Sequence, residues 1–407
     1  MTSTRAYPTA PAWAHAMRTV GVTGTNGKTS TALLLAAALS DEGVPPPPAL
    51  TTIGLAIGGA TRSIGDHRQF VEALKTAYDG GERRAVLEMT SLSLARGGAK
   101  AWPFHGAIFT SFSHDHLDLH ASASEYLAAK AQLFMHVQAG GFAVLPVDDP
   151  AAALVEEVIS GEVSIYRYGE EGRRSPQDAM IRDVEVSWSG TRVRMEDGTE
   201  LAVPLVGRHF ARNAVAALVA ARAMGVDSER AARGIARAAT MPGRFERVAD
   251  APNVVVDYAH SPDAMVKTMA TARQLARGAR VVVVFGAAGG TDRSHRPALA
   301  RAAGAADRVI VTTDNARDED GAAIASELRN AIADHAHVEV LLDRRSAIAA
   351  AITDARPNDV VIVAGKGHET EQVERDEARP FSDAAVVREL VAGAAHGFTR
   401  TRPAEGT

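Results

Sequence analysis

The stretch from Thr19 to Ser30, TVGVTGTNGKTS, contains the residue types that bind phosphate groups. A short apolar run leads into the turn GTNG, and Lys28 and Thr29 then open an apolar segment of helical character. Backbone amides at such a turn converge on an anion, the lysine reaches terminal phosphates, and the threonine hydroxyl reaches a magnesium ion. The strict pattern Gly-x4-Gly-Lys-Thr fails at Val22, so a glycine-rich turn with a solvated Lys28 is the alternative. We expect the phosphates to contact Gly24, Thr25, Asn26, Gly27, Lys28, Thr29 and Ser30.

Such a loop needs a strand before it and a helix after it, and the rest of the chain repeats that alternation. Segments of helical period, such as residues 122–134 and 213–225, separate short apolar runs that are typical of buried strands. Residues 185–207 alternate at period two around an Asp-Gly turn, which indicates an added antiparallel hairpin. The expected buried strands are residues 85–89, 106–110, 142–147, 253–258, 280–286, 308–313 and 359–365.

This pattern predicts an α/β protein with two domains. A doubly wound, mostly parallel sheet with the phosphate loop and the hairpin comes first, followed by a smaller Rossmann-like domain. A Pro-Gly break at MPGRFERV sets the boundary at Met241. We therefore expect an N-terminal lead (1–18), a first domain (19–240), a second domain (241–398) and a flexible tail (399–407).

Composition excludes several classes of function. The 407 residues are 46% hydrophobic and 23% charged, with a formal net charge of -5, which gives no sign of a nucleic-acid partner. The absence of cysteine excludes disulfides, cysteine-ligated metals and a thiol nucleophile. No apolar run reaches membrane-spanning length, and the N-terminus lacks the apolar core of a signal peptide. We expect a cytoplasmic protein that binds neither membranes nor nucleic acids.

Four further stretches, taken with the phosphate loop, resemble the Mur ligases, the ATP-dependent amide-forming enzymes of peptidoglycan precursor synthesis. The family resemblance extends from Val20 to about residue 395. Three motifs, DYAHSPDAM, DNAR and GKGHE, are most similar to the MurE branch of the family. In order along the chain, the four stretches are TSFSHDHLDLHASASEYLAAKAQLF (110–134), GRHFARNAVAA (207–217), MPGRFERV with VVVDYAHSPDAM (241–265) and VIVAGKGHE (361–369).

The resemblance implies a reaction that starts with ATP. A carboxylate becomes an acyl phosphate, an amine attacks it, and ADP and phosphate are released. Two Mg2+ ions are implied, one held by Thr29 and Glu88 and the other by His116 and Lys130. In this family the lysine carries a CO2-derived carbamate, which turns a cation into an anion suited to Mg2+. A solvated Lys130 and an ordinary structural His116 are the alternatives; the implied catalytic set is Lys28, Glu88, His116 and Lys130.

The remaining contacts are also implied by the resemblance. ATP would further contact Asn213 of the first domain and Arg244, Asp257 and His260 of the second, which closes over the nucleotide. The incoming amino acid would bind the second domain, with the fork of Arg317 on a carboxylate and Glu369 at the far end. The implied amino-acid contacts are Asp314, Asn315, Arg317, Gly365 and Glu369.

Several positions depart from the MurE pattern. The paired threonine–proline box is absent before Glu88, and Ala316 replaces a proline. The phosphate loop begins at Thr19, so we expect no uridine-nucleotide-binding domain ahead of it, because a domain needs about 50 residues or more. Other replacements are Leu92, Pro146, Gly290 and Thr291. We therefore expect a MurE-like ligase for a different carboxylate, such as a smaller metabolite, a peptide or a carrier-bound intermediate.

Two alternatives remain open. One is a genuine MurE-type ligase that joins diaminopimelate or lysine to UDP-MurNAc-dipeptide, with a partner chain supplying the uridine site. The other is an ATP-binding scaffold or regulatory pseudo-ligase without turnover. A scaffold needs no second metal site, so retention of the implied catalytic and metal-binding residues argues against it. These residues are Lys28, Thr29, Glu88, His116 and Lys130.

Overall fold

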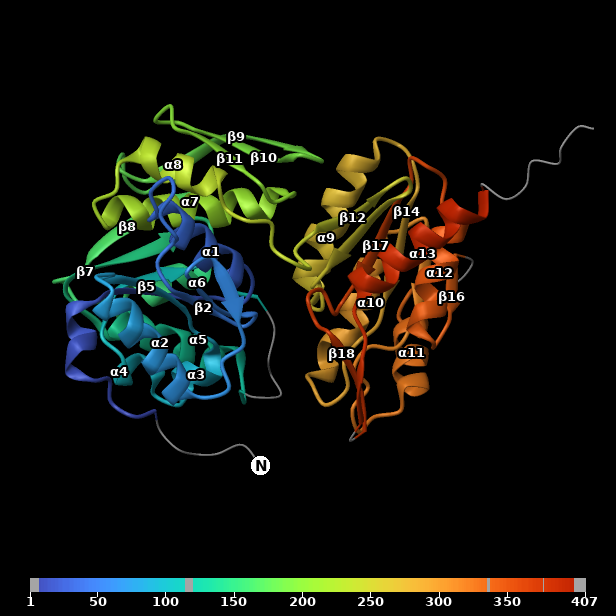
Figure 1. Ribbon diagram of the computed structural model, residues 1–407, viewed down its shortest axis with the longest axis horizontal. Helices are drawn as coiled ribbons and strands as arrows, with labels where there is room; N and C mark the ends of the chain where they lie inside the picture. The colour runs from blue at the N-terminus through green and yellow to red at the C-terminus, as the bar shows by residue number, and fades with distance from the viewer. Residues whose placement is uncertain (1–6, 114–119, 335–336, 376, 399–407) are drawn as a thin grey trace, which may run out of the picture. The chain divides into compact units, whose positions relative to one another are not determined.

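The computed structural model describes residues 7–113, 120–334, 337–375 and 377–398. Its contacts divide the chain into two compact units (Figure 1). The first unit comprises Met1–Pro204 and Arg208–Ala239, and the second comprises Leu205–Gly207 and Thr240–Thr407. Among the helices described, none is long and apolar enough to cross a membrane.

The first unit is built on a mixed sheet, which within the described residues has the order β11-β10-β9-β8-β7-β6-β1-β5-β2-β3-β4. The central part of the sheet is parallel and consists of β2, β5, β1, β6, β7, β8 and β9. Antiparallel strands extend it at both edges, β3 and β4 beside β2, and β10 and β11 beside β9. The strands are β1 (Arg18–Thr23), β2 (Ala49–Thr51), β3 (Gly54–Ile57), β4 (Ala60–Arg62), β5 (Arg84–Glu88), β6 (Phe104–Phe109), β7 (Val137–Pro146), β8 (Ser164–Gly169), β9 (Ala179–Ser187), β10 (Gly190–Met195) and β11 (Glu200–Val203).

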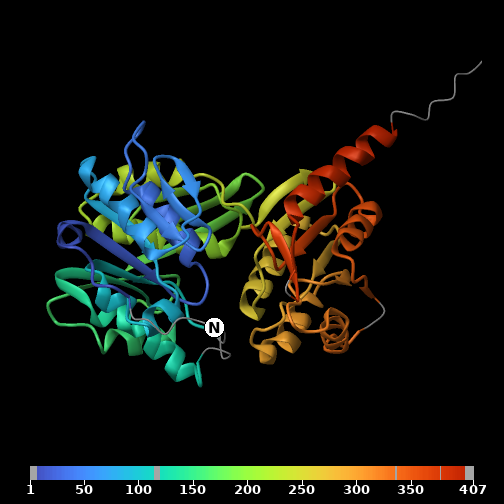
Figure 2. The same ribbon diagram turned by 60° about the horizontal axis from the view of Figure 1, so that its bottom comes forward.

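Helices cover both faces of this sheet (Figures 1 and 2). Helices α2 to α6 pack on one face, where a core cluster joins Phe70, Leu94 and Phe134 to the strand residues Leu87 and Phe109. Helices α1, α7 and α8 pack against one another on the other face. The helices are η1 (Ala12–Ala16), α1 (Lys28–Ala38), α2 (His67–Asp79), α3 (Ser91–Ala95), α4 (Gly98–Ala101), α5 (Ala123–Met135), α6 (Pro150–Glu156), α7 (Arg208–Ala223) and α8 (Ser228–Ala236).

The segment before β1 is part of the first unit's core. The ring of Trp13 lies 5.4 Å from that of Tyr78 and 6.1 Å from that of Trp102, measured between centroids. Ala10 N–H donates to Ala101 O at 2.8 Å, and Ala14 is fully buried. The short lead expected from the sequence is thus docked from Ala10 onward.

The antiparallel additions were only partly predicted. The expected hairpin at residues 185–207 is confirmed, because β10 and β11 pair in antiparallel around Asp197 and Gly198. Strand β9 pairs with β10 as well and makes a three-stranded meander. The pairs β2–β3 and β3–β4 were not expected from the sequence.

The second unit contains a sheet that, in the part of the chain described, has the order β12-β13-β17-β14-β15-β16. Its strands are parallel except β12, and a separate hairpin pairs β18 with β19. The strands are β12 (Glu246–Asp250), β13 (Asn253–Asp257), β14 (Val281–Phe285), β15 (Arg308–Val311), β16 (Val338–Val340), β17 (Val360–Ala364), β18 (Glu371–Glu374) and β19 (Glu377–Pro380).

Valine-rich strands place apolar side chains on both faces of this sheet, as expected for a covered parallel sheet. Ile348, Val387 and their neighbours on α12 and α13 pack on the face that carries Val254, Val282 and Val361. Helix α9 contacts β14 and β17, and α10 lies between α9 and α11. The helices are α9 (Pro262–Ala276), η2 (Arg293–His295), α10 (Arg296–Ala303), α11 (Gly321–Asn330), α12 (Arg344–Asp354) and α13 (Asp383–Phe398). The predicted fold class is confirmed in both units.

Candidate active site

In the first unit the predicted site residues gather at the carboxyl ends of three neighbouring strands. The phosphate loop follows β1, Glu88 ends β5, and Thr110 follows β6. Strand β1 lies between β5 and β6, so three loops from separate parts of the chain meet at one edge. Ligands of open parallel sheets bind at this edge.

The phosphate loop is held by the segment that follows β6. Thr25 N–H donates to Ser111 O at 2.7 Å, and Asn26 N–H donates to Ser111 Oγ at 3.1 Å. Gly24 has φ +147°, and a Cβ atom at this position would lie 2.0 Å from Thr110 Oγ1 and 2.9 Å from Ser111 N. Only glycine fits there, so Gly24 seats the loop against the end of β6.

Glu88 and Thr29 face each other at the start of α1. Thr29 Oγ1 donates to Glu88 Oε2 at 2.8 Å, and both residues are buried. The same carboxylate oxygen accepts the N–H of Thr52 at 3.1 Å, from the turn after β2. A carboxylate and a hydroxyl so placed are hard oxygen donors of the kind that Mg2+ prefers. Thr52 was not singled out from the sequence, because its contact depends on the pairing of β2 with β5; its Oγ1 also lies 3.3 Å from Thr29 Oγ1.

Two lysines reach the phosphate loop from different elements. Lys28 Nζ donates to Gly24 O at 3.1 Å and to Thr25 O at 2.7 Å. Lys130 Nζ donates to the same Gly24 O at 2.7 Å and lies 4.1 Å from the ring centroid of Tyr126. Lys130 is 1% exposed, so the alternative of a solvated lysine on α5 is wrong.

The other predicted residues of the first unit are also near the loop, apart from one that cannot be placed. A Cβ atom on Gly27 would lie 2.5 Å from Asn213 Oδ1, so α7 presents Asn213 to the turn. Ser30 is buried in the first turn of α1. His116 lies outside the described residues, and within them no cluster of three His, Cys, Asp or Glu side chains is placed to hold a metal.

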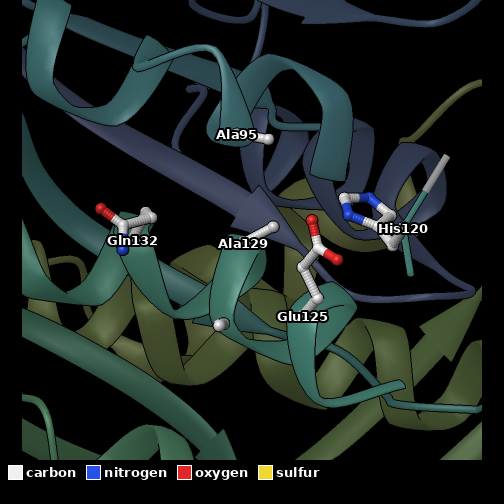
Figure 3. A pocket seen from close by; sticks show the side chains of 6 residues that line it. Ala95, His120, Glu125, Ala129 and Gln132 are labelled. Atoms are coloured by element: carbon white, nitrogen blue, oxygen red, sulfur yellow. The ribbon is translucent and has the colours of Figure 1, made fainter. Parts of the chain in front are cut away.

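Two cavities lie next to these residues. One of about 220 Å³ is lined by Ala95 of α3 and by His120, Glu125, Ala128, Ala129 and Gln132, at and before α5. Figure 3 shows the Glu125 carboxylate turned toward His120, whose ring is 5.2 Å from that of Tyr126. The other, of about 280 Å³, has mostly apolar walls that include Phe70, Leu87 and Trp102, and Glu88 borders it.

In the second unit, Arg244, Asp257 and His260 lie around Tyr258. The Arg244 guanidinium is 4.8 Å from the Tyr258 ring centroid, and the His260 ring is 4.6 Å from it. Asp257 ends β13 and accepts from Phe245 N–H at 2.6 Å, Ala259 N–H at 3.0 Å and Thr268 Oγ1 at 2.9 Å. Burial raises the pKa of Asp257 despite these donors. Its carboxylate therefore shapes the loop that carries Arg244.

The predicted amino-acid contacts form a second group, at the carboxyl ends of β15 and β17. A Cβ atom on Gly365, which has φ +112°, would lie 2.5 Å from Asp314 Oδ2. Asn315 Nδ2 donates to Glu369 Oε2 at 2.8 Å. Arg317 is exposed, and its guanidinium makes no hydrogen bond or ion pair with a described residue. The structure thus brings all five residues of this prediction together.

Two buried cations in this unit were missed from the sequence. Lys366 Nζ donates to Asn315 Oδ1 at 2.9 Å and to Glu369 Oε2 at 3.0 Å. Arg344 forms a fully buried fork with Asp383, with N···O distances of 2.8 and 2.7 Å. Neither was singled out from the sequence, because Arg344 pairs with Asp383 and Lys366 bonds to Asn315, and both partners are distant along the chain. Of the two, Lys366 could more easily have been identified from the sequence, because it lies within the GKGHE stretch that resembles the family.

A phosphate loop with an adjoining hydroxyl–carboxylate pair, followed by a Rossmann-like unit, is the arrangement of a class of ATP- and Mg2+-binding proteins that includes the ATP-dependent ligases. Comparison with known families supports this class in both units. The family model described as "Mur ligase middle domain" matches residues 22–221, and that described as "Mur ligase, glutamate ligase domain" matches residues 243–367. The chain belongs to the Mur ligase family and is an ATP-dependent acid–amino-acid ligase.

Curated relatives place it on the MurE side of that family. A UDP-N-acetylmuramoyl-L-alanyl-D-glutamate--2,6-diaminopimelate ligase of Aquifex aeolicus is 34% identical over 385 residues, covering 93% of this chain and 78% of the relative. The ligase of the same name in Solibacter usitatus is 37% identical, covering 94% and 78%. A solved structure of a ligase with this name matches with a TM-score of 0.65 and 30% identity, covering 96% of this chain and 80% of that one.

Proposed function

We propose that this chain joins 2,6-diaminopimelate to the terminal carboxylate of UDP-N-acetylmuramoyl-L-alanyl-D-glutamate, with ATP as the energy source. The observation that carries the proposal is the 34–37% identity to ligases of that name across more than nine-tenths of the chain. Among the alternatives from the sequence, this evidence favours the genuine MurE-type reaction over a changed carboxylate. It also removes support from the non-catalytic scaffold.

The chemistry divides between the two units. In the proposed first step a substrate carboxylate oxygen bonds to the γ-phosphorus of ATP and ADP leaves. In the second, the amine nitrogen bonds to the acyl carbon and phosphate leaves as the amine loses a proton. We assign ATP phosphates to the loop from Gly24 to Ser30, and the amino acid to the group around Arg317 and Glu369. Because ATP drives the reaction, we expect it to take place in the cytoplasm.

The residues at the loop fit a magnesium ion. Glu88 and Thr29 supply two oxygen donors 2.8 Å apart beside the phosphate loop, as a hard cation requires. Bound Mg2+ would supply charge neutralisation of the transferring phosphoryl group. A second ion at Lys130 requires the carbamate, because the ammonium would repel it. His116 would complete that site.

Four residues are proposed contacts of the base and ribose of the nucleotide: Asn213, Arg244, Asp257 and His260. Arg244 stacked on Tyr258 offers a planar cation to a purine ring or to a phosphate. Asp257 is engaged with three donors of its own unit, so we assign it the support of the Arg244 loop as well.

The direct test is a ligation assay with purified protein, ATP, Mg2+, UDP-N-acetylmuramoyl-L-alanyl-D-glutamate and diaminopimelate. We expect the tripeptide product by mass spectrometry, in equal amounts with phosphate. Lys130→Ala serves as the control and should give no product. Phosphate release with a different carboxylate and none with this nucleotide would contradict the proposal.

The cavity beside Glu88 favours a second candidate, a ligase for a carboxylate that carries an apolar group. Its volume of about 280 Å³ and its walls of Phe70, Leu87 and Trp102 suit a hydrocarbon or aromatic moiety better than a sugar nucleotide. The same assay with a panel of small aryl and alkyl carboxylates tests this reading, and Ala101→Phe, which fills the cavity, is the control.

A further inference from the structure

Lys366 lies at the junction of three segments of the second unit. Its Nζ donates to Asn315 Oδ1 at 2.9 Å, to Glu369 Oε2 at 3.0 Å and to Glu371 O at 2.6 Å. The residue is 0% exposed. An ammonium has three hydrogens to donate, and these three acceptors use all of them. Lys366 is therefore not free to bind a substrate itself.

Asn315 is oriented by the same network. Its Oδ1 accepts from Lys366 Nζ and from Val373 N–H, both at 2.9 Å, while its Nδ2 donates to Glu369 Oε2 at 2.8 Å. These contacts fix which way the amide faces, because the reverse orientation would place Nδ2 against two donors. Asn315 thus acts as a brace between the loop after β15 and the hairpin β18–β19.

Glu369 is held through one oxygen only. Oε2 accepts from Lys366 and Asn315, whereas Oε1 has no hydrogen bond with any described residue. The side chain is 32% exposed, while that of Lys366 is 0% exposed. One carboxylate oxygen is therefore anchored and the other faces solvent, as a contact for a ligand cation requires.

The network also sets the backbone beside Arg317. Arg317 N–H donates to Val373 O at 3.1 Å, and Arg375 N–H donates to Arg317 O at 2.7 Å. Lys366 reaches the start of the same hairpin through Glu371 O. One buried ammonium thus links Glu369 to the strand that positions the exposed guanidinium.

We propose that Lys366 is a positioning residue for amino-acid selection: it holds Glu369 with Oε1 free, so that the site prefers an amino acid bearing a second ammonium group. This inference rests on the proposed function, which places the amino acid at Arg317 and Glu369. Burying a lysine is costly unless its charge is compensated, and here Glu369 compensates it. Without Lys366 the carboxylate keeps only the Asn315 amide as a donor to Oε2, and the selectivity of the site falls.

The test compares diaminopimelate with 2-aminopimelate, which lacks the second amino group. In the Lys366→Met variant we expect the KM for diaminopimelate to rise at least tenfold, with the KM for ATP within twofold. The ratio of kcat/KM values for the two amino acids should fall at least tenfold. Lys267→Met is the matched control, because it removes a half-buried ammonium, paired with Asp263 at 2.6 Å, from the same unit. A purely structural role would lower kcat/KM for both amino acids equally and would overturn the proposal.

Comparison of Glu369→Gln with the double variant separates positioning from general damage, and it does not require the Lys366→Met single variant to be stable enough to assay. If Lys366 acts through Glu369, adding Lys366→Met to Glu369→Gln changes selectivity less than twofold further. Additive losses would contradict the inference.

A crystal structure of Lys366→Met gives a readout that does not depend on activity. We expect the Asn315 and Glu369 side chains to leave the positions described. If both stay in place the inference fails, whatever the enzyme ligates. If the wild-type protein does not ligate diaminopimelate, the proposed function fails. The crystal structure of Lys366→Met still shows whether Lys366 positions Asn315 and Glu369.

Discussion

At the scale of single residues, the contact between Thr29 and Glu88 is the one to which we assign the Mg2+ of the proposed phosphoryl transfer. The two side chains come from the start of α1 and the end of β5 and meet at 2.8 Å. A buried carboxylate next to a phosphate site needs a donor or a cation, and Thr29 supplies the donor. We propose that the same hydroxyl shares a Mg2+ ion with Glu88 when a nucleotide is bound.

We therefore expect Thr29→Val, which keeps the shape and removes the oxygen, to lower kcat/KM for ATP by roughly 10- to 100-fold, the range for a lost hydrogen bond to a charged group. Thr29→Ser keeps the hydroxyl and should stay within about fivefold of wild type. Steady-state ligation rates at several Mg2+ concentrations measure both. Equal activity of the two variants would show that the hydroxyl has no such role.

Sequence reasoning predicted the residues that belong to short local patterns. Thr29 follows a glycine-rich turn, and Lys130 shares a helical face with Tyr126 and Phe134, so both positions could be found in one stretch of chain. Lys366 and Arg344 could not be recognised as buried hubs in this way. Asn315 lies 51 residues from Lys366 and Asp383 lies 39 residues from Arg344, and no local period relates them. Glu369, three residues after Lys366, is the one partner within the same stretch that was singled out.

At the scale of elements, the turn between β1 and α1 is held in place by contacts with other elements. Gly24 is closed in by Thr110 and Ser111, and both Lys28 and Lys130 donate to its carbonyl oxygen. The strand, turn and helix were predicted from the apolar run and the Gly-Lys-Thr sequence. Their seat on the end of β6 was not, since it depends on how the sheet orders its strands.

A side chain at Gly24 should push this turn off its seat. We expect Gly24→Ala to weaken binding of a non-hydrolysable ATP analogue more than tenfold, because the added Cβ meets a buried hydroxyl and a backbone nitrogen. Gly43→Ala is the control: Gly43 also has positive φ, at +74°, but nothing lies within 4 Å of its Cβ position. That variant should lose about 1 kcal/mol of stability and keep its affinity. Isothermal titration calorimetry distinguishes the two outcomes, and equal affinities would contradict this account of the turn.

At the scale of the whole molecule, each unit has its own sheet and its own apolar core. Alternation of apolar and helical segments was enough to predict two α/β units. It did not predict the docked N-terminal segment, because Trp13 and Ala14 lie in a stretch with neither period. The core of the second unit also contains the Arg344–Asp383 pair, which ties α12 to α13.

Removing one partner of that pair should destabilise the second unit alone. We expect Arg344→Met to cost roughly 3–5 kcal/mol there, because Asp383 is left buried without its cation. Hydrogen exchange followed by mass spectrometry should show faster exchange than in wild type for peptides from α12, α13 and β15. Peptides from β1 and α1 should exchange at the wild-type rate.

The neighbouring Arg345→Met is the matched control for this change. Arg345 is exposed and pairs with the exposed Glu389, so peptides of this variant should exchange as in wild type. Faster exchange in the first unit of Arg344→Met would refute the assignment of this pair to one core.

The packing of Trp13 against Trp102 has a spectroscopic consequence. The chain contains three tryptophans, and the third, Trp188, also belongs to the first unit. Tryptophan emission therefore reports the unfolding of the first unit only, whereas far-ultraviolet circular dichroism reports both. In denaturation curves of Arg344→Met, the early transition of the second unit should appear in circular dichroism and be silent in fluorescence. In Gly43→Ala, where the first unit is perturbed, the shifted transition should appear in both signals.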